Sequence, residues 1–340
     1  MISTNCLRNS GVLFNPIKRF FSSGTGKINI DFKVRDFIKE NPAIFTLNGG
    51  SKILKSFSDS TEKEYTEYLK GNSSTLSRNS KEEIIKYEYQ LQGQSKFIYD
   101  GKSPDINMWS RQTPRTPQHV MEDKSKAVED IYIDLLNSPD DNIQLLAIGS
   151  DNAIEVTVLS IELIKSGKNV EIVATEVNPL QLNVARIVND QANQFLLSQG
   201  LSTISSSYYM HDIVSNDLEP LVSKGKTTIA LPLRSGIILA KTTGKIIKSA
   251  DKITTILLKD SQKTGKAFVE KYRAKIVSEN EYSTVYQNLI SQYIAFKSET
   301  GVEKFFNEMG GRVNSVETLE DTPDDRGTES SVFIVNAEKR

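Results

Sequence analysis

Short apolar runs and helical segments alternate through most of this chain. An apolar run at 143–148 ends at Gly149, and a helical segment follows at 153–166. A second apolar run, 170–175, leads directly to Glu176. Two apolar strands joined by a helix predict a parallel pair. The same alternation continues toward the C-terminus, which predicts an α/β fold with a doubly wound, mostly parallel sheet of seven strands.

The remaining segments of the pattern complete this architecture. Two β-rich runs flank an acidic turn near the C-terminus, and they predict a closing antiparallel β-hairpin. The further strands are expected at 206–210, 227–233, 253–259, 312–319 and 331–337. The helices are expected at 120–137, 179–198, 215–223, 235–249, 263–277, 281–297 and 301–309.

The N-terminal third is more polar and has only weak helical periodicity. Helical pieces are expected at 32–40, 61–70 and 81–92, and Ser80 with Glu83 matches a capping box for the last of them. The prolines of 109–117 predict an extended linker. The expected organisation is therefore a presequence at 1–21, a helical, partly irregular N-terminal extension at 22–118 and the main domain at 119–340.

The first thirty residues are basic, rich in serine and free of acids before Asp31. This composition is typical of a mitochondrial transit peptide. Arg19, Phe20 and Phe21 precede two serines, a pattern that resembles a matrix-processing site with cleavage after Phe21. The expected location is the mitochondrial matrix. A disordered basic tail is the alternative interpretation.

Composition excludes several kinds of site. The chain has 340 residues and a net charge of −1. Its single cysteine, Cys6, lies in the presequence, so a mature chain has no disulfide, thiolate metal site or cysteine nucleophile. Two histidines, His119 and His211, are too few for a histidine metal site, and we expect none. No apolar run reaches the length of a membrane span.

The unit around Gly149 and Glu176 has the residue types of a nucleoside site. Ligands of α/β sheets bind outside the carboxyl ends of the strands. Gly149 permits a close approach of the backbone, and the Glu176 carboxylate can accept ribose hydroxyl protons. Asp212 follows the third strand in a similar position. The alternative for these residues is ordinary turn chemistry at solvated strand ends.

These features resemble the class I methyltransferases that use S-adenosylmethionine (SAM). The resemblance covers about 120–340 and is carried by the turn at 147–153, by the stretch that begins Glu176-Val-Asn-Pro, and by Asp212. It implies SAM as the cofactor and methyl transfer to an N or O nucleophile, with RNA, protein and small molecules all open as acceptors. It names no general base. The implied cofactor-binding residues are Gly149, Ser150 and Asp151 at the methionine end, Glu176 and Val177 at the ribose, and Asp212 and Ile213 at the adenine.

The chain also departs from that family. Ala147 stands where the family has an acid, and Asp151 and Ala153 replace its second and third glycines. The Asn/Asp-Pro-Pro-aromatic signature of amino-group methylators is absent at 230–233. These departures favour the alternative of a catalytically inactive scaffold or assembly protein in the matrix. The absence of a G-x-G-x-x-G fingerprint disfavours a third possibility, a nicotinamide-dependent oxidoreductase.

Basic residues concentrate in one stretch. Between Lys224 and Lys275 the chain has thirteen basic residues and three acids. Such a cluster is the footprint expected of a phosphate-backbone binder, so RNA is a candidate partner. Solvated helix faces are the alternative.

Overall fold

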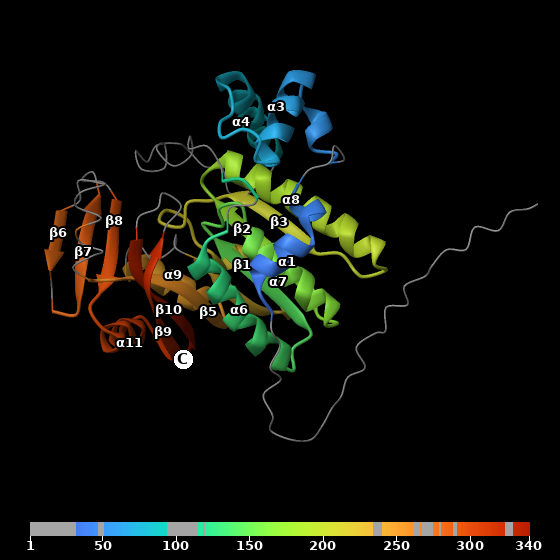
Figure 1. The fold of residues 1–340 in the computed structure, drawn as a ribbon. Coiled ribbons are helices and arrows are strands. Elements are labelled where there is room, and N and C mark those ends of the chain that lie inside the picture. The colour runs from blue at the N-terminus through green and yellow to red at the C-terminus, as the bar shows by residue number, and fades with distance from the viewer. Residues whose placement is uncertain are drawn as a thin grey trace, which may run out of the picture. The chain divides into compact units, whose positions relative to one another are not determined.

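The protein is built around a β-sheet (Figure 1). The order of its strands reverses beside the first strand. In the computed structural model, five parallel strands run in the order β3-β2-β1-β4-β5, and β10 pairs antiparallel with β5 and with β9. The doubly wound sheet and its C-terminal antiparallel hairpin are therefore confirmed. These strands are β1 (Asn142–Ile148), β2 (Asn169–Glu176), β3 (Ser205–Met210), β4 (Thr227–Leu231), β5 (Lys252–Lys259), β9 (Gly311–Pro323) and β10 (Glu329–Lys339).

The described residues belong to one compact unit, 32–340. The predicted presequence, 1–21, lies outside the described residues. Within that unit the structure describes 32–46, 51–93, 115–117, 120–233, 240–261, 266, 275–278, 280–287, 291–323 and 329–340.

Helices cover the sheet because alternate strand residues point to opposite faces. Leu146 and Ile148 of β1 pack in one buried cluster with Ile247, Phe305 and Phe306. Helices α6, α7 and α8 contact one another and the sheet from the other face. The helices of the main domain are α6 (Glu122–Asn137), α7 (Ile154–Lys165), α8 (Pro179–Ser198), α9 (Ala240–Ser249) and α11 (Glu299–Glu308), with a 3₁₀ turn, η2 (Glu219–Leu221).

Two predicted helices are wrong. The segment 281–297 forms β7 (Tyr282–Gln287) and β8 (Ser291–Phe296), which pair with each other and, through β7, with β6 (Lys275–Ser278). β8 extends the main sheet, because Ala295 and Phe296 pair with the end of β5. Cross-strand pairs of aromatic and β-branched residues among β6, β7 and β8 outweigh the weak helical periodicity.

The other wrong helix is 215–223, which forms turns that end in η2. Pro220 lies in the first turn of η2. The preceding residues are held by Asp212, whose carboxylate accepts from Val214 and Ser215 and whose carbonyl accepts the Asn216 N–H in one isolated turn. Most of the predicted helix 263–277 lies outside the described residues, but its end is wrong, because 275–277 belong to strand β6. The first part of 235–249 also lies outside the described residues, while α9 confirms the second part.

The described residues between 32 and 93 are mostly helical and pack on the main domain. Helix α1 contacts α6 and α7, while α2 and α4 contact α8. The elements of this segment are α1 (Val34–Glu40), α2 (Pro42–Phe45), η1 (Leu54–Ser56), α3 (Asp59–Leu69) and α4 (Arg78–Gln92).

The predicted capping box of α4 is wrong. Ser77 is the N-cap, and its hydroxyl accepts the Ser80 N–H at 3.3 Å. Glu83 instead binds another helix start, where it accepts the backbone N–H and the hydroxyl of Ser58, both at 2.7 Å. The cap therefore lies three residues before the position that the motif suggested.

A buried polar network joins α4 to the main domain. Glu88 is fully buried and accepts hydrogen bonds from Arg186 Nε (3.0 Å) and Asn183 Nδ2 (3.2 Å) of α8. Burial raises the pKa of Glu88, whereas the neighbouring Arg186 lowers it. One turn later, the Gln92 amide donates to the Tyr208 carbonyl at 3.1 Å, on the outer edge of β3. The extension thus covers the edge strand of the sheet.

We predict that Glu88→Gln destabilises the fold by about 3 kcal/mol, because it leaves the Arg186 cation without its buried counter-charge. Urea unfolding followed by circular dichroism measures the change. Glu82→Gln on the same helix is the control, since Glu82 pairs only with the exposed Arg78 and the change should stay within about 0.5 kcal/mol. Equal effects of the two substitutions would contradict the assignment.

Candidate functional site

The strand order reverses between β1 and β4, so the crevice outside their carboxyl ends is the expected ligand site. The loop 149–153, which joins β1 to α7, lies at this position. It is tied to β2, because the Ser150 N–H donates to the Thr175 carbonyl at 2.9 Å. Five of the seven predicted site residues, from this loop and from the end of β2, therefore come together at one edge of the sheet.

The backbone of the loop is unusual. Gly149, Asp151 and Ala153 all have positive φ, at 55°, 55° and 52°. For the two residues with side chains, this left-handed conformation costs on the order of 1–2 kcal/mol each. The chain thus adopts a glycine-type backbone at two positions where glycine is absent, and strain of this kind clusters at functional sites.

The Glu176 carboxylate holds the loop in place. Its Oε2 accepts the Asp151 N–H at 2.9 Å, and its Oε1 accepts the N–H groups of Val177 (2.8 Å) and Asn178 (3.1 Å). A carboxylate has about four acceptor sites, so three backbone bonds leave room for about one more hydrogen bond. Glu176 can accept one ribose hydroxyl in this arrangement, where the sequence suggested two.

The electrostatics of Glu176 follow from this position. Burial raises the pKa of Glu176, and the nearby Asp151 carboxylate raises it further. The three backbone N–H donors act in the opposite direction. The balance is a pKa above the ordinary carboxyl range, so this group takes up a proton more readily than an exposed glutamate.

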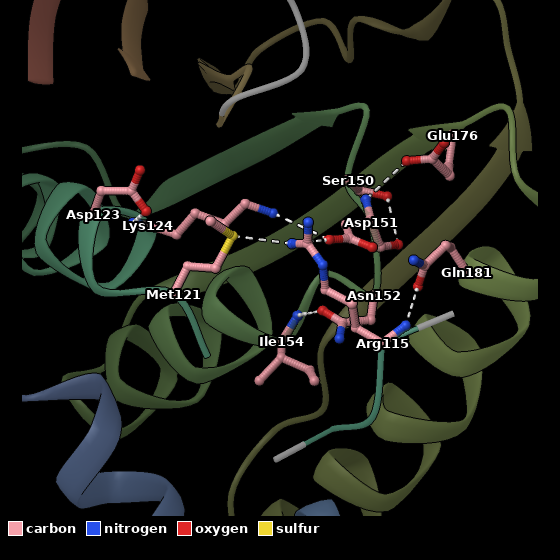
Figure 2. A network of polar contacts seen from close by, with 10 residues as sticks. All are labelled: Arg115, Met121, Asp123, Lys124, Ser150, Asp151, Asn152, Ile154, Glu176 and Gln181. Carbon is pink, nitrogen blue, oxygen red and sulfur yellow. Dashed lines mark hydrogen bonds and ion pairs between the residues drawn. The ribbon is translucent and has the colours of Figure 1, made fainter. Parts of the chain in front are cut away.

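Two cations converge on Asp151 (Figure 2). Arg115 Nη1 lies 2.5 Å from Asp151 Oδ2, and Lys124 Nζ lies 3.4 Å from the same oxygen. Arg115 comes from the segment before α6, where its backbone N–H donates to Gln181 Oε1 at 3.3 Å. The sequence analysis did not predict either cation, because no local sequence pattern indicates that Arg115 or Lys124 pairs with Asp151, which lies far away along the chain.

Asn152 and Asn178 secure the two helix starts beside the site. Asn152 is buried, its Oδ1 accepts the Ile154 N–H at 3.4 Å, and its Nδ2 has no hydrogen-bond partner among the described residues. Asn178 is the N-cap of α8, and its Oδ1 accepts the Leu180 N–H at 3.0 Å. Both asparagine side chains therefore bind backbone N–H groups where α7 and α8 begin.

Asp212 and Ile213 follow β3 at the same edge of the sheet, as the resemblance implied. The Asp212 carboxylate accepts the Val214 N–H at 2.9 Å and the Ser215 hydroxyl at 2.7 Å, so it shapes its own turn. Ile213 packs against the buried cluster. Their contact with an adenine ring stays a prediction.

The basic stretch is partly neutralised. Lys226, Lys245 and Lys259 form ion pairs with Glu171, Asp217 and Glu320. Arg234, Lys263, Lys271 and Arg273 lie outside the described residues, so RNA binding by this stretch stays a prediction.

No group of three or more His, Cys, Asp or Glu side chains in the described part of the chain fits a metal ion. None of the described helices is long and apolar enough to cross a membrane.

Comparisons with known proteins give structural similarities alone. No family model and no curated protein matches the sequence. A magnesium protoporphyrin IX methyltransferase from Synechocystis, solved with S-adenosylhomocysteine (SAH), is similar at 12% identity and a TM-score of 0.40, over 85% of this chain and 98% of that one. A putative RNA methyltransferase from Pyrococcus horikoshii is similar at 15% identity and a TM-score of 0.38, over 77% of this chain and 98% of that one.

A third similar structure is a 1,6-didemethyltoxoflavin-N1-methyltransferase from Burkholderia thailandensis with bound SAH. It has 10% identity and a TM-score of 0.40, over 78% of this chain and 91% of that one. The strand order itself identifies the fold. Five parallel strands continue into an antiparallel β10 and a terminal β9, in the order that the resemblance implied, and β8, β7 and β6 extend this sheet to ten described strands, where seven were predicted.

Proposed function

We propose that this protein is a SAM-dependent methyltransferase. One observation carries the proposal. The carboxylate of Glu176, at the carboxyl end of β2, faces a strained loop beside the point where the strand order reverses. A carboxylate at this position supports a ribose site in the crevice outside the strand ends. Glu176 would bind a ribose hydroxyl, the loop 149–151 would face the methionine end, and Asp212 with Ile213 would flank the adenine.

SAM supplies an electrophilic methyl group, so the protein's task is to bind the two reactants and align them. The acceptor that we propose is an N or O nucleophile. Methylation of a pyrimidine carbon through a cysteine adduct is disfavoured, because the only cysteine, Cys6, lies in the predicted presequence. RNA is one candidate acceptor, through the stretch between Lys224 and Lys275. The hydrogen bonds by which Asn152 and Asn178 hold the helix starts beside the site support positioning of this kind.

A second candidate is a methyltransferase-like scaffold without catalysis. The side chains of Asp151 and Ala153 favour it, because they occupy the loop where the family has glycines. The two candidates differ in one measurable property, the binding of SAM.

We predict that the full chain binds SAM and that Glu176→Gln weakens binding about 10- to 100-fold, because the variant replaces the charged acceptor of the ribose hydroxyl. Calorimetric titration measures this. Glu171→Gln is the matched control on the same strand, since Glu171 bonds Lys226 and Ser223 at the opposite end of β2. An unchanged affinity in Glu176→Gln contradicts the ribose assignment. A folded wild type that binds no SAM at millimolar concentration supports the scaffold.

The raised pKa of Glu176 predicts a pH dependence of SAM binding. The ionised carboxylate accepts a hydroxyl proton, and the protonated form loses an acceptor. We therefore expect the affinity to fall as the pH is lowered through this raised pKa, at a higher pH than an exposed glutamate would give. Titrations across mildly acidic pH check this. Glu176→Gln should flatten the profile and Glu171→Gln should retain it, and a profile that persists in Glu176→Gln would assign the titration to another group.

We also propose the mitochondrial matrix as the location, on the composition of 1–21. The expected result is a mature protein in the matrix fraction whose mass and terminal peptide begin at Ser22. An intact Met1 terminus, or recovery outside mitochondria, would contradict it.

A further inference from the structure

Lys124 has more hydrogen-bonding capacity than its surroundings use. Its side chain is 6% exposed, and its ammonium has a single partner among the described residues, Asp151 Oδ2 at 3.4 Å. An ammonium has three donors, and a buried cation is costly unless it is well paired. One long contact satisfies this group poorly, so its position at the ligand edge of the sheet indicates that it binds another anionic group.

Arg115 contacts the same oxygen. Its guanidinium lies 2.5 Å from Asp151 Oδ2, and Nη1 also lies 3.0 Å from Met121 Sδ. In Figure 2 both cations point toward Asp151 between the loop and the start of α6. Two cations therefore share one carboxylate oxygen, although a guanidinium and an ammonium together can bind a second carboxylate.

We propose that Arg115 and Lys124 bind the α-carboxylate of a ligand whose α-ammonium is bound by Asp151. The ligand class is an α-amino acid zwitterion, here the methionine end of SAM or SAH, so the inference rests on the proposed function. Without ligand, the three side chains pair with one another. When the zwitterion binds, each of them exchanges a protein partner for a ligand group of the same charge.

The charges favour a zwitterion over a phosphate. A phosphate dianion beside Asp151 and Glu176 would meet two carboxylates, whereas a zwitterion brings no net charge and presents an ammonium to Asp151. The same reasoning explains why an acid occupies a position of positive φ that glycine would fill without strain. The carboxylate there provides a contact that glycine has no atoms to make.

The test compares two nucleosides in the full chain. SAH has the α-amino acid group, and methylthioadenosine has the same nucleoside without it. We expect Arg115→Ala and Lys124→Met to weaken SAH binding about 10- to 100-fold in calorimetric titrations and to leave methylthioadenosine binding unchanged. Retained methylthioadenosine binding also shows that each variant is folded at the site.

Lys126→Met is the matched control, because Lys126 lies on the same helix but pairs with Asp130 and Glu317. It should leave both affinities unchanged. The inference is overturned if Arg115→Ala and Lys124→Met keep the wild-type ratio of the SAH affinity to the methylthioadenosine affinity. This holds whether both affinities fall equally or neither changes. If the wild type binds neither nucleoside, the proposed function fails and the inference fails with it.

Discussion

The hydrogen bonds of one carboxylate hold the candidate site together. Glu176 accepts N–H groups from the loop after β1 and from the turn before α8, so one side chain fixes two connections that leave neighbouring strands. Charge-assisted bonds to backbone donors are among the stronger ones in proteins. These hydrogen bonds oppose the effect of burial, which raises the pKa of Glu176. The strained loop keeps its shape because its central N–H has this partner.

The N-terminal extension contributes to the same region from outside the sheet. Through Glu88 and Gln92, α4 covers the edge strand whose end leads to Asp212. The segment at 115–117 brings Arg115 to Asp151. Because these contacts join residues far apart in the chain, the site depends on segments that lie outside the parallel sheet itself.

The sequence predicted what is encoded locally. Apolar runs that end at Gly149 and Glu176 located the two strands and the edge where they meet, because burial on both faces makes a strand recognisable. The strands at 282–296 were not predicted, since their conformation depends on pairing with each other, with β6 and with the end of β5. Arg115 and Lys124 were also missed, because an ion pair across the fold leaves no pattern in the sequence.

The two missing glycines show how the site differs from the family pattern. Asp151 and Ala153 adopt the left-handed backbone that glycine would adopt, so the path of the loop does not depend on glycine at these positions. What changes is the side chain, because Asp151 places a carboxylate where a glycine leaves open space, and two cations gather around it. The substitution therefore alters the charge of the site while its backbone is retained. In the arrangement that we propose, a ligand pairs with Asp151, Arg115 and Lys124 in place of the ion pairs that these side chains make with one another.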